Sequence, residues 1–314
     1  MAPDMTEEKP RHASPLYVKL PESEYCIDYI LVAEKNVVLA KESDDASKIT
    51  PGTANTLKTI ADFLDALPII LSNKISGEKL EESIVYSRHN IPVVSHETFK
   101  HLFTGGRAPL IYFSHGGVYV KVRGKKLKEL REKMGLSRGE LAWRIGVSNK
   151  AIVNYEEGES DVSLDVAWKL EKLFGDVIFE EVSTESLKEI FNEKIKAPDS
   201  EPRDAILRSV FIELRSYGFK NYVFSKVPFD AGVKFAREKI NVKIAIKEES
   251  SSKDIMIASK VSEHTHTPLV LIANTLDEVG DEENLVVVKS KDPRKVRDAI
   301  LNIFKREGQQ VHFQ

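Results

Sequence analysis

The feature that most constrains this chain is a series of helix starts and stops between Lys125 and Phe174. Three glycines, Gly135, Gly146 and Gly158, divide the segment, and glycine often ends a helix because it adopts the left-handed conformation without strain. Between the glycines, apolar residues recur at helical spacing. The segment therefore predicts four short helices joined by tight turns.

Cap residues locate the starts of these helices. Ser137 with Glu140 three residues later is the pattern of a capping box, and Ser148 takes the same place before the third helix. Small Ala142 lets the third helix cross close to the second, and Gly146 permits the sharp turn between them. The predicted helices cover 125–134, 138–145, 149–156 and a segment from about 163, with Leu127, Leu130, Met134, Leu141, Ala142, Ile145, Ile152, Tyr155, Val166, Ala167, Leu170, Leu173 and Phe174 facing inward.

The pattern Ser-x-x-x-Leu-Ala-x-x-Ile-Gly-Val-Ser-x-x-x-Ile-x-x-Tyr-Glu-x-Gly runs without a gap from Ser137 to Gly158. It resembles the helix-turn-helix of the lambda-repressor/Cro type, also called the XRE family. The resemblance implies that the second helix touches DNA at its start, Arg138, and that the third helix enters the major groove. A four-helix bundle without a DNA role is the alternative, but such a bundle does not need these small residues at the turn.

The third predicted helix presents side chains suited to reading bases. Its exposed face carries Asn149, Lys150 and Asn154. Asparagine pairs bidentately with adenine, lysine reaches guanine, and a small residue such as Ala151 can meet a thymine methyl group. Ser148 and the backbone amides at the helix start suit a phosphate.

Positive charge is concentrated beside this face. Between residues 121 and 150 there are ten basic residues against three glutamates, in a chain whose formal net charge is −3. The basic residues are Lys121, Arg123, Lys125, Lys126, Lys128, Arg131, Lys133, Arg138, Arg144 and Lys150. This excess favours phosphate contact over an ordinary solvated face, with Lys125, Lys126 and Arg144 among the contacts. Glu156 and Glu157 are expected at the helix end, away from DNA.

Strand and helix patterns alternate on both sides of this module, which predicts an α/β domain in each flank. In each flank an aspartate opens a strand (Asp28, Asp230), and a lysine lies at the end of the next strand (Lys41, Lys247). This order of strands and residues resembles the restriction-endonuclease-like fold, whose signature is an Asp followed by a Glu-x-Lys on the next strand. In that fold the two carboxylates hold Mg²⁺ and the lysine helps to polarise the water or phosphate.

The glutamate of that motif is missing from both flanks. Leu39 takes its position in the first flank and Ala245 in the second. The resemblance therefore implies scaffolds that bind metal poorly and do not catalyse. Whether the flanks are a duplication or two unrelated α/β units stays open at this point.

The sequence predicts an α+β multi-domain chain, with an all-α lambda-repressor-like domain between two α/β domains. This whole layout resembles a group of archaeal helix-turn-helix transcriptional regulators. The expected divisions are a disordered N-terminus at 1–13, an α/β domain at 14–108, a β-hairpin connector at 109–123, the helix-turn-helix domain at 124–182, a helix and linker at 183–202, a second α/β domain at 203–308 and a tail at 309–314.

Several classes of protein are excluded by composition. A single cysteine, Cys26, allows no intramolecular disulfide framework and no multi-cysteine metal site. No apolar run reaches the roughly 18 to 20 residues that a bilayer requires, and the N-terminus has no secretion signal. His264 and His266 flank Thr265 without a third ligand nearby. We therefore expect a cytoplasmic protein with no membrane association, no bound metal and no cofactor.

These features together predict a sequence-specific regulator of transcription that binds double-stranded DNA and is not an enzyme. Because one helix-turn-helix reads one half-site, a homodimer on a palindromic operator is expected, held together by the α/β flanks. Two alternatives stay open. One is a nuclease that uses the flanks for chemistry and the central module for targeting. The other is a regulator gated by an unidentified small-molecule effector.

Overall fold

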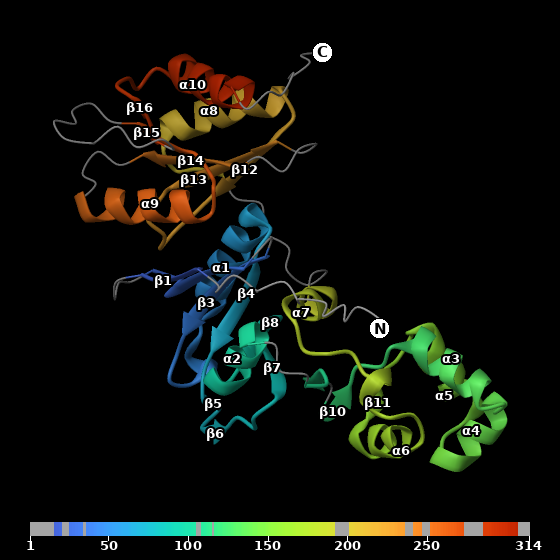
Figure 1. Ribbon diagram of the computed structural model, residues 1–314. Coiled ribbons are helices and arrows are strands. Elements are labelled where there is room, and N and C mark those ends of the chain that lie inside the picture. Colours follow the sequence, from blue (N-terminus) through green and yellow to red (C-terminus); the bar gives the residue numbers. More distant parts are fainter. Residues whose placement is uncertain are drawn as a thin grey trace, which may run out of the picture.

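The computed structural model describes residues 16–20, 25–33, 36–104, 108–114, 116–191, 201–235, 241–246, 252–272 and 285–306. The expected N-terminus (1–13), most of the expected linker (192–200) and the tail (309–314) lie outside these residues. Within them, a helical module follows one α/β unit and precedes another, as Figure 1 shows. The predicted α+β multi-domain class is confirmed. Among the described helices, none is both long and apolar enough to span a bilayer.

A nine-stranded sheet runs through the first α/β unit and on into the helical module, in the order β1-β2-β3-β4-β8-β7-β9-β10-β11. Its strands are β1 (Leu16–Lys19), β2 (Tyr29–Ala33), β3 (Asn36–Glu42), β4 (Leu67–Leu71), β7 (Ile84–Arg88), β8 (Ile91–Val94), β9 (Ile111–Ser114), β10 (Gly117–Val120) and β11 (Val162–Ser163). The same unit holds η1 (Ala46–Lys48), α1 (Pro51–Leu64), the small hairpin β5 (Lys74–Ile75) and β6 (Glu78–Lys79), and α2 (His96–Thr104).

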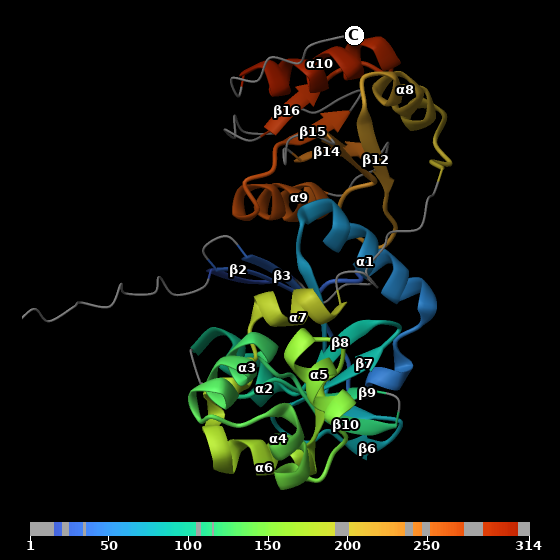
Figure 2. The same cartoon turned by 90° about the vertical axis from the view of Figure 1, so that its right-hand side faces the viewer.

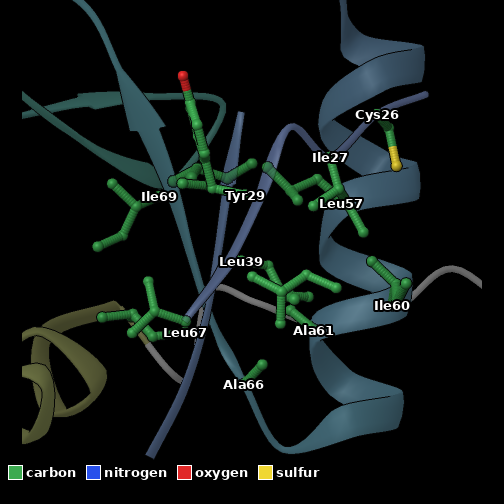
Figure 3. Close-up of a cluster of buried hydrophobic side chains, with 14 of the residues drawn as sticks. Cys26, Ile27, Tyr29, Leu39, Leu57, Ile60, Ala61, Ala66, Leu67 and Ile69 are labelled. Carbon is green, nitrogen blue, oxygen red and sulfur yellow. The ribbon is translucent and has the colours of Figure 1, made fainter. Parts of the chain in front are cut away.

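Helix α1 anchors the core of the first unit. The Thr50 side chain caps it by accepting the Thr53 backbone N–H at 3.2 Å, and Asp65 ends it in the left-handed conformation, with φ of 53°. Figure 3 shows its buried face against two strands, with Leu57, Ile60 and Ala61 beside Leu39 of β3 and Leu67 and Ile69 of β4.

The second α/β unit is a five-stranded sheet in the order β12-β13-β14-β15-β16. Its strands are β12 (Phe219–Val223), β13 (Ala231–Phe235), β14 (Asn241–Ile246), β15 (Leu269–Ile272) and β16 (Leu285–Val288), and its helices are α8 (Ala205–Ser216), α9 (Ser252–His264) and α10 (Pro293–Arg306). Helices α8 and α10 lie side by side on one face, and α9 covers the other face (Figures 1 and 2).

The two α/β units share one plan. In β1-β2-β3-β4-β8 and in β12-β13-β14-β15-β16, the first two pairs are antiparallel and the next two are parallel. A helix connects the third and fourth strands in both units (α1 and α9), and another follows the fifth (α2 and α10). The hydrogen bond that closes the first strand pair also recurs, from Leu20 N–H to the Asp28 carbonyl at 2.8 Å and from Phe224 N–H to the Asp230 carbonyl at 2.9 Å. This agreement supports an internal duplication.

The strand register corrects one detail of the expected repeat. Tyr29 pairs with Ala40 and Ala231 pairs with Ile244, so the position equivalent to Lys41 is Ala245. Matching Lys41 with Lys247 was wrong by two residues, because the spacing along the chain does not show where the longer connection is absorbed. Lys247 itself lies outside the described residues.

One hydrophobic core extends across both α/β units. The Phe63 ring of α1 lies against the backbone of Gly232 in β13, where an added Cβ would come within 2.6 Å of a ring carbon. The same ring meets Phe224 edge-on, with centroids 5.4 Å apart. An ion pair between Lys234 and Asp65, at 2.7 Å, lies at the edge of this junction. The two units are therefore packed together, not merely tethered.

The helical module is fixed to the first unit in a similar way. The hairpin of β9 and β10 turns at Gly116, whose φ is 76°, and β10 pairs with β11 of the module. Asp161 closes the attachment by accepting the Tyr112 hydroxyl at 2.8 Å and the Val122 backbone N–H at 3.2 Å. After the module, α7 (Thr184–Phe191) returns to pack near β4 and β8. The connector is thus part of a continuous sheet.

Candidate nucleic-acid interface

The module contains the four predicted helices. They are α3 (Gly124–Lys133), α4 (Arg138–Ile145), α5 (Asn149–Glu157) and α6 (Leu164–Phe174), followed by the short η2 (Asp176–Ile178). The predicted bounds of α4 are confirmed, and those of the other helices are met to within a residue or two. In Figures 1 and 2 the module lies at the opposite end of the molecule from the second α/β unit.

Side-chain caps define the turn between α4 and α5. The capping box is present: Ser137 Oγ accepts the Glu140 N–H at 3.1 Å, and Glu140 Oε2 accepts the Ser137 N–H at 2.7 Å. These bonds hold the pKa of the Glu140 carboxyl below its usual value. Gly146 ends α4 with φ of 77°, as the turn requires, and Ser148 Oγ accepts the Ala151 N–H at 3.1 Å. The helix-turn-helix geometry therefore follows from local sequence.

The outward face of α5 is open in this chain. Asn149 and Lys150 are exposed, and Ala151 and Asn154 are half-buried at the side of the helix. Ile152 points inward and is fully buried. All four predicted base-reading residues are thus at least partly accessible, Asn149 and Lys150 at the helix start and Ala151 and Asn154 further along it.

The residues predicted to contact phosphate differ in their exposure and in whether they already have a hydrogen-bond partner. Lys125 and Arg144 are exposed, whereas Lys126 Nζ donates to Glu129 at 3.0 Å along its own helix. Arg138 is half-exposed, and its Nε donates to Glu156 Oε2 at 2.8 Å. Arg138 is therefore partly engaged in holding the module together.

The role of Glu156 was not anticipated from the sequence. It lies at the end of α5, as expected, but its side chain is 1% exposed and bridges Arg131 of α3 and Arg138 of α4. Burial raises the pKa of Glu156, but hydrogen bonds and attraction from the two guanidinium groups outweigh it, so the net shift is downward. Arg131 also donates to the Leu136 carbonyl at 2.8 Å. One carboxylate thus joins α3, α4 and α5.

Two further residues of the module were not correctly anticipated from the sequence. Met134, predicted to face inward, is 48% exposed, because α3 ends at Lys133 and Leu136 takes the buried position. Gly124 lies so close to α5 that an added Cβ would come within 2.4 Å of the Tyr155 carbonyl oxygen. This glycine lets α3 and α5 touch.

A second polar site lies where β2 begins and β3 ends, in a pocket of about 430 Å³. Asp28 Oδ1 pairs with Lys41 Nζ at 3.0 Å, and Asp28 Oδ2 accepts the Glu42 backbone N–H at 2.7 Å. His96 Nε2 lies 2.8 Å from Glu42 Oε1. Leu39, where the nuclease-like motif would supply a second carboxylate, is fully buried.

These donors do not fit the magnesium ion that the fold resemblance implies. The Asp28 carboxylate is already satisfied by Lys41 and a backbone amide, and Mg²⁺ prefers several oxygen ligands. Across the described part of the chain, no three His, Cys, Asp or Glu side chains are grouped so that they could hold a metal.

The geometry defines a class of protein: a helix-turn-helix module built into the sheet of a nuclease-like α/β unit. Comparison with known families agrees. The model of the PD-(D/E)XK superfamily domain matches residues 11–109, and the model described as helix-turn-helix matches residues 127–179. The helix-turn-helix resemblance is confirmed, and the nuclease-like resemblance is confirmed for the first flank.

Whole-chain relatives come from archaea and carry the name "Putative HTH-type transcriptional regulatory protein". The one from Thermococcus kodakarensis is 30% identical, over 88% of this chain and 91% of its own length. The one from Methanocaldococcus jannaschii is 31% identical, over 90% of this chain and 89% of its own length. The one from Pyrococcus horikoshii is 32% identical, over 76% and 74%. The chain belongs to this family of archaeal helix-turn-helix proteins.

Proposed function

We propose that this protein is a sequence-specific regulator of transcription that binds double-stranded DNA through α5, in the manner of Cro-type proteins. The observation that carries the proposal is the open face of α5 directly after a capped, left-handed turn. A recognition helix in that position reaches base edges with its first residues while the preceding helix lies against the backbone. The names of the archaeal relatives support the same role.

Residue roles follow from exposure and chemistry. Base reading falls to Asn149, Lys150, Ala151 and Asn154, since these residues are accessible on α5 and have side chains that suit base edges. Contact with phosphate falls to Ser148, whose hydroxyl can still donate while its oxygen caps the helix, and to the surrounding cations. Those cations are Lys125, Lys126, Arg138 and Arg144.

We further propose that the protein binds a palindromic operator as a homodimer, because one module covers only a half-site. We place this complex in the cytoplasm. The side of α1 that bears Phe63 is already buried against the second α/β unit of the same chain. A second copy must therefore dock elsewhere on the α/β flanks. Sedimentation of the full chain with and without a selected duplex measures the stoichiometry.

The test of the proposal is a titration of selected duplex DNA by gel shift. Fragments bound from genomic DNA supply the duplex, and Asn149→Ala should weaken binding by about 1–3 kcal/mol. Arg138→Ala should weaken binding by a similar amount, but it also removes an ion pair to Glu156, so its folding must be checked separately. Full affinity in both variants would contradict the proposed roles.

The match to a PD-(D/E)XK domain supports one competing function, that of a DNA nuclease directed by the helix-turn-helix. Incubation of plasmid with Mg²⁺ or Mn²⁺ distinguishes the two. The missing carboxylate at Leu39 and the Asp28–Lys41 ion pair predict intact plasmid. Cleavage that disappears in Asp28→Ala or Asp230→Ala would favour the nuclease.

A further inference from the structure

A hydrogen bond between Glu156 and Arg138 joins the two helices that the proposed DNA-binding mode uses. Glu156 lies in α5, whose first residues are proposed to read bases. Arg138 is the first residue of α4, the helix proposed to lie against the DNA backbone. Arg138 Nε donates to Glu156 Oε2 at 2.8 Å. The reading helix therefore sets the orientation of a cation at the start of its neighbour.

The Glu156 carboxylate is itself held in place. It is almost fully buried, and both of its oxygens accept hydrogen bonds from Arg131, Oε1 from Nε and Oε2 from Nη2, the latter at 3.3 Å. Arg131 is buried as well and donates in turn to the Leu136 carbonyl at 2.8 Å. The acceptor that meets Arg138 thus belongs to a packed cluster and does not follow the motion of a surface side chain.

This arrangement leaves one edge of the Arg138 guanidinium open. An arginine can grip an oxyanion with two parallel hydrogen bonds, and the edge formed by Nη1 and Nη2 is one that can do so. Glu156 occupies Nε. Within the described residues, Nη1 and Nη2 donate no hydrogen bond, and neither atom is buried, although the whole side chain is only 36% exposed. The two terminal nitrogens are therefore accessible while their orientation is set from behind.

A fixed orientation matters for affinity and for register. Immobilising a long, free side chain on binding costs conformational entropy, and a side chain that is already oriented avoids most of that cost. Contacts to phosphate also determine how a protein is positioned on the duplex, although they do not read sequence. A cation oriented from α5 would place α5 and the DNA backbone in a fixed relation.

We propose that Glu156 is a positioning residue for DNA binding, which holds the Arg138 guanidinium so that Nη1 and Nη2 donate together to one backbone phosphate. Glu156 itself does not touch DNA. This inference rests on the proposed DNA-binding function and deepens it, because it names the contact that aligns α4 and α5 on the duplex.

The sign of the effect separates positioning from simple charge. A carboxylate near the backbone repels phosphate, so on charge alone Glu156→Gln would strengthen binding. The substituted amide has one acceptor oxygen, which the buried Arg131 is expected to retain, and its NH2 group then faces Arg138. Arg138 loses its orientation, and positioning therefore predicts weaker binding.

The test is a titration of a labelled, selected duplex by fluorescence anisotropy, with full-length variants at fixed salt. Glu156→Gln should weaken binding about fivefold or more in the wild-type background. In the Arg138→Ala background it should not weaken binding at all, because the side chain that it positions is gone. Lys125→Ala is the matched control: it removes an exposed cation of α3, and Glu156→Gln should act by the same factor with and without it.

A second variant tests the geometry with Glu156 left intact. Arg138→Lys keeps the positive charge but not the paired terminal nitrogens, so affinity should fall about fivefold or more. This variant decides the question even if Glu156→Gln does not fold. Native-state hydrogen exchange of α3, α4 and α5 shows which variants are folded under the conditions of the titration.

Three results would overturn the inference. Glu156→Gln could bind as tightly as wild type or more tightly, which would reduce its role to charge. It could weaken binding equally in the Arg138→Ala background, which would reduce its role to folding. Arg138→Lys could bind as wild type does. Failure of the proposed DNA-binding function looks different, because wild type itself would then show no preference for the selected duplex.

Discussion

Replacing Glu156 with glutamine should destabilise the helix-turn-helix module without removing any surface that faces DNA. The change leaves the Arg131 guanidinium, 7% exposed, without its buried counter-charge. Removing one partner of a buried pair typically destabilises by about 3–5 kcal/mol. Arg131 keeps its bond to the Leu136 carbonyl and its contact with Glu132, so we expect a loss near the lower end, about 3 kcal/mol.

The assay is native-state hydrogen exchange of the backbone amides of α3, α4 and α5, which gives the free energy of opening of this module. Fluorescence is less suitable, because Trp143 and Trp168 are 84% and 56% exposed in the folded module. The matched control is Glu157→Gln on the neighbouring, exposed residue, which should change stability by less than about 0.5 kcal/mol. A loss below about 1 kcal/mol in Glu156→Gln, or an equal loss in both variants, would refute the role assigned to the ion cluster.

The remaining predictions concern pH, helix packing, the domain junction and the buried thiol. The folded-state pKa of Glu156 is lowered, so the stabilisation by its carboxylate is fully present above its unfolded pKa of about 4.3 and is lost as pH falls through the lower folded value. The difference in free energy of unfolding between wild type and Glu156→Gln should therefore narrow below about pH 4.5 and stay constant at neutral pH. Gly124→Ala should destabilise the module by about 1–3 kcal/mol in the same hydrogen-exchange assay, because its Cβ collides with the α5 backbone; unchanged stability would mean that the helices are not in contact there. Phe63→Ala should lower the free energy of unfolding by about 3–5 kcal/mol and separate the thermal unfolding transitions of the two α/β units. A single, unchanged transition would contradict the shared core. Burial raises the pKa of the Cys26 thiol to about 12, so a thiol reagent at pH 8 should label it only after unfolding, and fast labelling of the native protein would contradict its position.

The helix-turn-helix could be predicted almost completely because its determinants are local. Capping serines and turn glycines act within one or two helical turns, so Ser137 and Gly146 show in the sequence what they do in the structure. The sheets were harder to predict, because strand pairing joins segments that lie far apart in the sequence. Nothing local to β11 shows that it extends the sheet of the first unit, and no strand was predicted at β1, β7 or β16.

The buried charges of the module were misjudged for a different reason. A charged residue on a helix is usually solvated, so Arg131 was counted with the phosphate-binding cations and no buried contact was predicted for Glu156. A signal was nevertheless available. Arg131 follows buried Leu127 by one helical turn, and Glu156 follows buried Ile152 in the same way. Opposite charges on two inward-facing stripes indicate a buried ion pair.

The most direct test of the central claim is the affinity of the full chain for a selected duplex relative to a scrambled duplex at fixed salt. Wild type should favour the selected duplex by roughly 10³-fold or more. Asn149→Ala, on the open face of α5, should reduce this ratio, whereas Lys126→Ala should weaken binding to both duplexes alike and leave the ratio unchanged. If Asn149→Ala left the ratio intact, or if both variants behaved identically, α5 would not be reading bases.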